Sequence, residues 1–122
     1  MKNLIVTNPE IFYEKNYDNI ILGEWCFLNH ESHKILKNCE LFKFYHWDDY
    51  KKKKKDFEYL TSLLDRIILD LKKKYNYHFN LKYTERFYYT LLYPWLSKYI
   101  IYIYDRWEIL KTFSEKNQNL KT

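Results

Sequence analysis

The apolar residues of this chain change their spacing near residue 49, and this change constrains the fold more than any other feature of the sequence. Before it, short apolar runs end at turn residues, as in NLIVT (3–7) and NIILGEWC (19–26). These runs, together with CELFKFYHW (39–47), are typical of buried strands. After it, apolar residues recur every three or four positions, which indicates helices. The sequence therefore predicts a sheet that is followed by helices.

The connections between the expected strands favour parallel pairing. Residues 29–38 fit a short helix with Asn29 as its N-cap, and residues 10–15 fit a helical turn between the first two strands. A helix between two strands allows them to run in the same direction. We therefore expect an α/β fold with a small three-stranded parallel sheet, followed by two long helical segments.

The first long helix is predicted over residues 49–76, with Asp48 or Asp49 as its N-cap. Its apolar stripe consists of Phe57, Leu60, Leu64, Ile67, Leu71 and Tyr75. This regular spacing is typical of an amphipathic helix that buries one face.

The second helical segment is predicted over residues 83–115. Pro94 lies inside it and removes a helical hydrogen bond, so we expect a kink or two separate helices there. Its apolar stripe is expected to consist of Phe87, Leu91, Leu92, Trp95, Leu96, Tyr99, Ile103, Trp107 and Leu110. Residues 117–122 are polar and are expected to fray, which leaves residues 1–116 as a single α/β domain.

Composition limits the chemistry that the chain can perform. Gly23 is the single glycine, which leaves almost no room for a glycine-rich phosphate loop. Cys26 and Cys39 lack metal-type spacing and fit reduced thiols in a cytoplasmic protein. Residues 89–104 contain Lys98 and are too short for a membrane span. We expect no cofactor, no metal and no membrane span.

Polar residues follow two of the expected strands. Ligands of open parallel sheets bind beyond the carboxyl ends of the strands, so Gly23, Glu24 and Trp25 are candidates for one side of a site. Glu24 could act as a general base. The alternative is a tight turn with a tryptophan in the core.

The stretch His46-Trp47-Asp48-Asp49 follows the third strand. Histidine is a common general acid or base, which makes His46 the second catalytic candidate, and Trp47, Asp48 and Asp49 could bind polar groups of a substrate. The aspartates could equally cap the next helix. No cysteine or second histidine lies at a spacing that would favour zinc.

Two basic features complete the set of candidates. Lys51–Lys55 is a run of five lysines at the start of a helix, which is typical of a solvated surface. Nucleic-acid binding would need interleaved stacking aromatics, so it is not expected. Arg106, on the last helix, could hold a carboxylate or phosphate, or it could pair with Asp105.

Five short motifs resemble one bacterial family, the transferases of surface-carbohydrate (lipopolysaccharide) biosynthesis of the leptospiral type. They are Val6-Thr7, Leu22–Cys26, Tyr45–Asp49, Pro94–Leu96 and Asp105–Trp107. Together they span nearly the whole chain. Tyr93 departs from the pattern, since a glycine is expected before Pro94.

Members of that family are several times longer than this chain. The resemblance therefore implies the N-terminal part of a larger Rossmann-like transferase, inactive alone, whose full-length form would use an activated sugar or a carbohydrate. It adds weight to Glu24, His46, Asp48, Asp49 and Arg106 without assigning a catalytic residue. Two alternatives remain, a small basic module that binds nucleic acid or a protein partner, and a purely structural fragment. The sequence does not define an oligomeric state.

Overall fold

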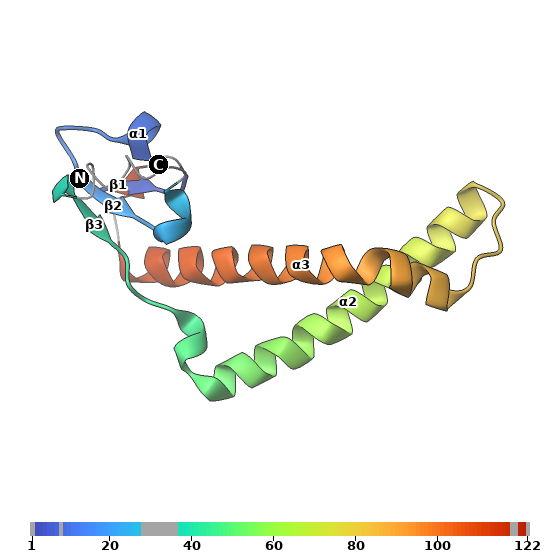
Figure 1. The fold of residues 1–122 in the computed structure, drawn as a ribbon. Coiled ribbons are helices and arrows are strands. Elements are labelled where there is room, and N and C mark those ends of the chain that lie inside the picture. Colours follow the sequence, from blue (N-terminus) through green and yellow to red (C-terminus); the bar gives the residue numbers. More distant parts are fainter. Residues whose placement is uncertain (1, 8, 28–36, 118–119, 122) are drawn as a thin grey trace. The chain divides into compact units, whose positions relative to one another are not determined.

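The computed structural model describes residues 2–7, 9–27, 37–117 and 120–121 (Figure 1). The chain divides into two compact units. We call them the sheet unit, which comprises residues 1–45 and 108–122, and the helical unit, which comprises residues 46–107. Each unit is described by itself. The expectation of a single domain over residues 1–116 stays a prediction.

The sheet unit contains a parallel sheet with the strand order β3-β2-β1-β4. In register, Leu4 lies opposite Ile20 and Ile5 lies opposite Ile21. The expected parallel pairing of the first three strands is therefore confirmed. The strands are β1 (Lys2–Ile5), β2 (Asp18–Ile21), β3 (Cys39–Leu41) and β4 (Leu120–Lys121).

The strand β4 comes from the tail that we expected to fray. Two of its residues pair with β1, Leu120 with Lys2 and Lys121 with Asn3. Lys2 Nζ also donates a hydrogen bond of 2.8 Å to Asn117 Oδ1. A polar tail can pair in this way because a parallel ladder uses backbone groups alone.

A buried pair of asparagines joins β1 to β2. Asn3 Nδ2 donates to Asn19 Oδ1 at 2.8 Å, and Asn19 Nδ2 donates to the carbonyl of Glu14 at 2.7 Å. The same Asn19 Oδ1 accepts from the backbone N–H of Glu14 at 3.1 Å. These bonds hold the link between the strands, which includes the short helix α1 (Pro9–Phe12). Proline suits the first position of a helix because its missing N–H is not needed there.

Alternation along the strands gives the sheet two apolar faces. On one face Ile5 and Ile21 pack with Cys26. On the other, Leu4, Ile20 and Leu22 pack with residues of the last helix, Ile109 and Phe113. Every one of these eight side chains is buried. The sheet unit is therefore completed by a segment that lies far from it in the sequence.

The third strand is shorter than predicted. β3 ends at Leu41, and Phe42–Tyr45 is not a strand, although the N–H of Phe42 still donates to the carbonyl of Ile21 at 2.9 Å. β2 itself ends at Ile21, so no strand residue remains for Phe44 and Tyr45 to pair with. The helix expected over residues 29–38 lies largely outside the described residues.

Two long helices build the helical unit, α2 (Tyr50–His78) and α3 (Glu85–Lys116). The last nine residues of α3 belong to the sheet unit. The expected helix over residues 49–76 is confirmed. Asp49 is its N-cap, since its carboxylate accepts hydrogen bonds from the N–H groups of Lys51 and Lys52 at 2.9 and 3.3 Å.

The two helices pack through apolar side chains and polar pairs. Leu64 and Ile68 of α2 form a buried cluster with Tyr88 and Leu96 of α3. Tyr89 donates a hydrogen bond of 2.8 Å to Asp65 Oδ1, and this bond to a carboxylate raises the pKa of Tyr89 to about 12. The fold is therefore three parallel strands followed by two long helices, with a short fourth strand.

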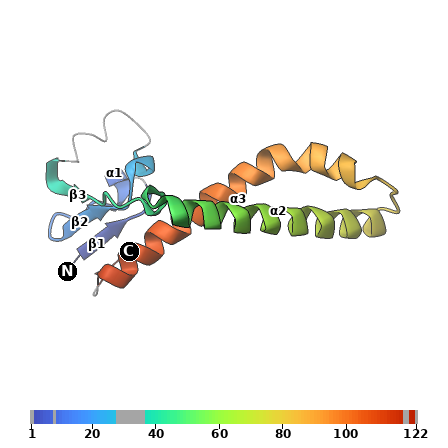
Figure 2. The ribbon, with the colours of Figure 1, turned by 90° about the horizontal axis from the view of Figure 1, so that it is seen from below.

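The second helix differs from the prediction at Pro94. It is continuous over Glu85–Lys116, so the expected division into two helices is wrong, and the part that contains Pro94 curves (Figure 2). Pro94 is exposed, while Leu92, Leu96 and Ile100 pack against α2. Packing on both sides of the proline maintains the helix despite the lost hydrogen bond.

The apolar stripe predicted for this helix is mostly wrong. Leu96 is buried and Leu92 and Leu110 are partly buried, but six other members are exposed. The exposed members are Phe87, Leu91, Trp95, Tyr99, Ile103 and Trp107. Apolar and aromatic residues lie on every face of this segment, so their spacing does not identify the buried face. None of the described helices combines the length and the apolar character needed to cross a membrane.

Candidate functional site

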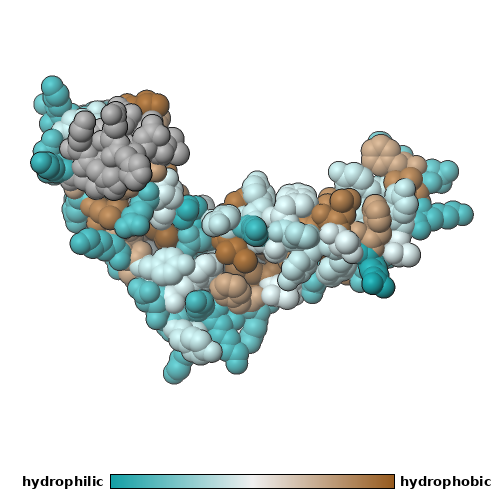
Figure 3. Space-filling view, in the orientation of Figure 1, coloured by the Kyte–Doolittle hydropathy of each residue, from teal (hydrophilic) through white to brown (hydrophobic). Residues whose placement is uncertain are grey.

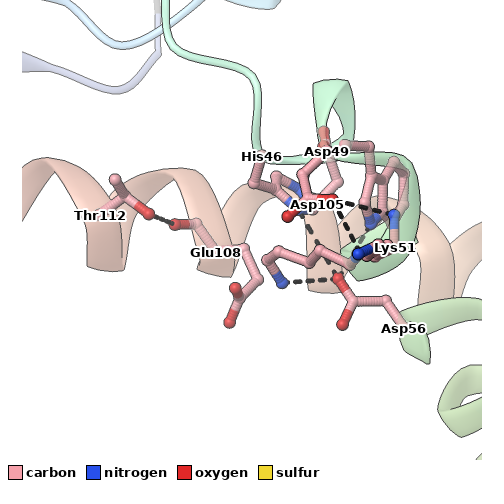
Figure 4. A network of polar contacts seen from close by, with 9 residues as sticks. His46, Asp49, Lys51, Asp56, Asp105, Glu108 and Thr112 are labelled. Carbon is pink, nitrogen blue, oxygen red and sulfur yellow. Dashed lines mark hydrogen bonds and ion pairs between the residues drawn. The ribbon is translucent and has the colours of Figure 1, made fainter. Parts of the chain in front are cut away.

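His46, Asp56 and Asp105 form a buried polar cluster in the helical unit, and we call it the His46 network (Figure 4). They come from three elements: η3 (His46–Asp48), α2 and α3. His46 Nε2 lies 3.1 Å from Asp105 Oδ1, and His46 Nδ1 lies 3.8 Å from Asp56 Oδ2. The imidazole thus lies between two carboxylates and is 2% exposed.

The carboxylate of Asp56 accepts hydrogen bonds from several donors at once. Lys52 Nζ lies 2.6 Å from Asp56 Oδ2, and Trp47 Nε1 donates to the same oxygen at 3.0 Å. Burial alone would raise the pKa of Asp56. Hydrogen bonds from Lys52, Tyr104 and Trp47 and the charge of Lys52 outweigh burial, so the pKa is lowered from 3.8. Asp56 is therefore an ionised acceptor at neutral pH.

Asp105 bridges the histidine and an arginine. Its Oδ1 faces His46, while its Oδ2 accepts a hydrogen bond of 2.7 Å from Arg106 Nη1. The expected alternative for Arg106, pairing with Asp105, is confirmed. A lysine and an arginine therefore balance the two carboxylates that flank His46, which lowers the cost of burying these charges.

Aromatic rings surround the network. The ring of Trp47 lies 4.6 Å from that of His46 and 5.2 Å from that of Phe57, and it stacks on Tyr104 at 6.4 Å. Aromatic packing of this kind excludes water and strengthens the hydrogen bonds of the polar groups that it encloses. His46 does not face open solvent, so the geometry favours holding and orienting Asp105 over direct contact with a ligand.

A small cavity lies beside this aromatic layer, between α2 and α3. It measures about 120 Å³ and is lined by Phe57, Leu60, Thr61, Leu64, Tyr93, Ser97, Ile100 and Ile101. Sites for cofactors and drug-sized ligands usually measure about 300–1,000 Å³. The cavity is therefore too small for an activated sugar. Within the described residues, no group of three or more His, Cys, Asp or Glu side chains is arranged to hold a metal ion.

The structure brings some of the candidate residues together. His46 belongs to the network, and Trp47 and Arg106 donate hydrogen bonds to its carboxylates. Arg106 is 60 residues from His46 and 59 from Trp47 in the sequence. Asp48 and Asp49 are exposed, and Asp49 is confirmed as a cap. Their role in substrate binding stays a prediction.

The other candidates, Gly23, Glu24 and Trp25, lie in the sheet unit. Glu24 is exposed at the start of η1 (Glu24–Cys26), just after β2. That it converges with His46 and Arg106 on one site stays a prediction.

Sequence reasoning missed Asp56 and the role of Lys52. Asp56 lies four residues before Leu60, which is followed by Leu64 and Ile68, so it shares the buried face of α2. A carboxylate at helical spacing from the buried leucines indicates a buried polar group, and this could have identified Asp56 from the sequence. Lys52 lies one helical turn before Asp56. Four lysines of the run, Lys51 and Lys53–Lys55, are exposed as expected.

Gly23 is required by the tryptophan that follows it. Its backbone is extended, with φ −178°, which any residue adopts. A Cβ atom at this position would lie 1.9 Å from Cζ3 of Trp25, and the Trp25 ring packs against both apolar clusters of the sheet unit. The close approach of that ring to the backbone therefore explains the glycine.

Replacing Gly23 by alanine should lower the free energy of unfolding by about 2 kcal/mol, because the Trp25 ring must leave its position in the core. Urea unfolding monitored by circular dichroism measures the loss. A Gly23→Ala/Trp25→Ala double variant provides the control, since the clash is then absent. If Gly23→Ala costs as much without the Trp25 ring as with it, the clash is not the reason for the glycine.

The chain belongs to the LIC12162 family of transferases, since the model of the LIC12162 family transferase matches residues 2–122. The transferase class that the motifs implied is confirmed. Comparison with curated proteins and with solved structures gives no match.

Proposed function

We propose that the chain is the N-terminal part of a Rossmann-like transferase that builds surface polysaccharide, and that the full-length enzyme transfers a sugar from an activated donor to a carbohydrate acceptor. The family match over residues 2–122 carries the transferase class. The leptospiral type and the surface-carbohydrate role rest on the resemblance of the five motifs. The cytoplasmic location that we expect agrees with the use of an activated sugar.

Glu24 is the residue that we propose as general base. It is exposed and follows the carboxyl end of a parallel strand, where ligands of α/β sheets bind. A carboxylate there could accept the proton of an attacking sugar hydroxyl. Gly23 and Trp25 beside it are proposed to line the substrate site.

His46 is proposed to act through Asp105. Its ring is 2% exposed and faces Asp105 at 3.1 Å, and the other oxygen of Asp105 accepts from Arg106. His46 is therefore proposed to orient the guanidinium of Arg106 toward an anionic group of the donor, with Trp47 supporting this arrangement. The exposed Asp48 and Asp49 are proposed to accept hydrogen bonds from sugar hydroxyls.

Replacing Glu24 by glutamine tests this function. Glutamine keeps the size of the side chain but accepts no proton, so sugar transfer by the full-length protein should fall at least about a hundredfold. The measurement is the amount of surface polysaccharide in cells that carry the variant as their sole copy. Glu40→Gln, at another exposed glutamate of the sheet unit, is the matched control. Unchanged polysaccharide in the Glu24→Gln cells would contradict the role of Glu24.

A further inference from the structure

The helix α3 presents an apolar face to solvent within the helical unit. Leu91, Trp95, Tyr99 and Tyr102 lie three or four positions apart, so they share one face of the helix, and each is more than half exposed. Leu96 and Ile100 of the same helix pack against α2. In Figure 3, the helical part carries apolar side chains in brown between paler ones. Exposed apolar and aromatic side chains that share one face of a helix mark a place of interaction.

The composition of this face distinguishes between possible partners. Trp95, Tyr99 and Tyr102 combine an apolar ring with a polar tip, which favours the interface between lipid and water. Lys98 lies on the same face, four residues before Tyr102. Lysine is depleted from the core of protein interfaces. At a bilayer its stem can lie along the apolar surface while its ammonium group reaches the lipid phosphates.

Charge along the helix fits an anionic surface. Residues 86–104 contain no aspartate or glutamate, and they include Arg86 and Lys98. The exposed lysines at 51 and 53–55 add positive charge to the same unit. We propose that this face of α3 binds the surface of an anionic lipid bilayer. The helix lies along the interface because its other side packs against α2. This binding is independent of the transferase function.

Sedimentation with lipid vesicles tests this proposal. The whole chain should sediment with vesicles that contain phosphatidylglycerol and remain in solution with phosphatidylcholine alone. Trp95→Ser/Tyr102→Ser should lower the partition coefficient at least about tenfold, because it removes aromatic area from the face. The control is Tyr50→Ser/Tyr77→Ser, which changes two highly exposed tyrosines of α2 and should leave binding unchanged. Circular dichroism verifies that both variants are folded.

Three results would overturn the proposal. The first is failure to sediment with the anionic vesicles at low salt. The second is binding that survives Trp95→Ser/Tyr102→Ser but is lost when the lysines at 51 and 53–55 become glutamine, which would assign it to that run. The third is a dimer, seen by sedimentation equilibrium, that Trp95→Ser/Tyr102→Ser dissociates, since a second copy of the chain would then cover the face.

Discussion

Replacing Asp56 by alanine should lower the free energy of unfolding by about 3 kcal/mol, because it breaks a buried charge network by removing one partner. Asp56 is 7% exposed and accepts from Lys52 Nζ at 2.6 Å and from Trp47 Nε1 at 3.0 Å. Both donors lose this acceptor, and His46 loses a carboxylate at 3.8 Å. Urea unfolding at neutral pH measures the loss.

Asp48→Ala is the matched control, since Asp48 is an exposed aspartate eight residues earlier in the chain. Its substitution should change the free energy of unfolding by less than about 0.5 kcal/mol. Equal effects of the two substitutions would contradict the role given to Asp56.

The difference in stability between the original chain and Asp56→Ala should depend on pH. The pKa of Asp56 is lowered from 3.8 in the folded state, so its carboxylate contributes its full stabilisation above the unfolded pKa and loses it as the pH falls through the lower folded pKa. Below pH 4, the original chain should therefore lose more stability than Asp56→Ala does. If both lose stability in parallel, the pKa of Asp56 is not lowered by folding.

Replacing Phe113 by alanine should lower the free energy of unfolding by about 4 kcal/mol, since it leaves a cavity in the core of the sheet unit. Phe113 is 1% exposed and packs with Leu4, Ile20 and Leu22 of the sheet. Its ring also packs edge-to-face with the ring of Phe42, with 5.0 Å between the centroids. Denaturant unfolding of the whole chain measures the loss.

Trp107→Ala is the control on the same helix. Trp107 is 61% exposed although its spacing predicted a core position, so its substitution should cost less than about 1 kcal/mol. If Trp107→Ala costs more than Phe113→Ala, the buried face of α3 is the one that the apolar spacing predicts, and Phe113 does not belong to the core.

Local signals predicted much of this fold. The regular spacing from Leu60 to Ile68 predicted α2, and the two aspartates before it limited its N-cap to Asp48 or Asp49, because both are properties of neighbouring residues. The parallel sheet followed from the connections between the strands. The length of β3 did not follow, since a strand continues only where a neighbour can pair with it, and β2 ends at Ile21.

The network shows what local signals omit. His46 and Asp105 were visible only as members of separate motifs 59 residues apart. Apolar and aromatic residues occur on all faces of α3, so their spacing does not show which face is buried. The buried face is determined by the elements that pack against the helix. Asp56 lies in the buried stripe of α2 but is not apolar, so the spacing of apolar residues alone does not identify it. Glu24 lies in the sheet unit and the His46 network lies in the helical unit, so each is tested by its own experiment.

The motifs around residues 46 and 105 meet through the contact between His46 and Asp105. A double-mutant cycle tests it most directly, with His46→Gln, Asp105→Asn and the double variant measured by urea unfolding. The contact of 3.1 Å predicts a coupling energy of at least about 1 kcal/mol between the two substitutions. Effects that add to within about 0.3 kcal/mol would show that the two residues do not interact, and would contradict the account.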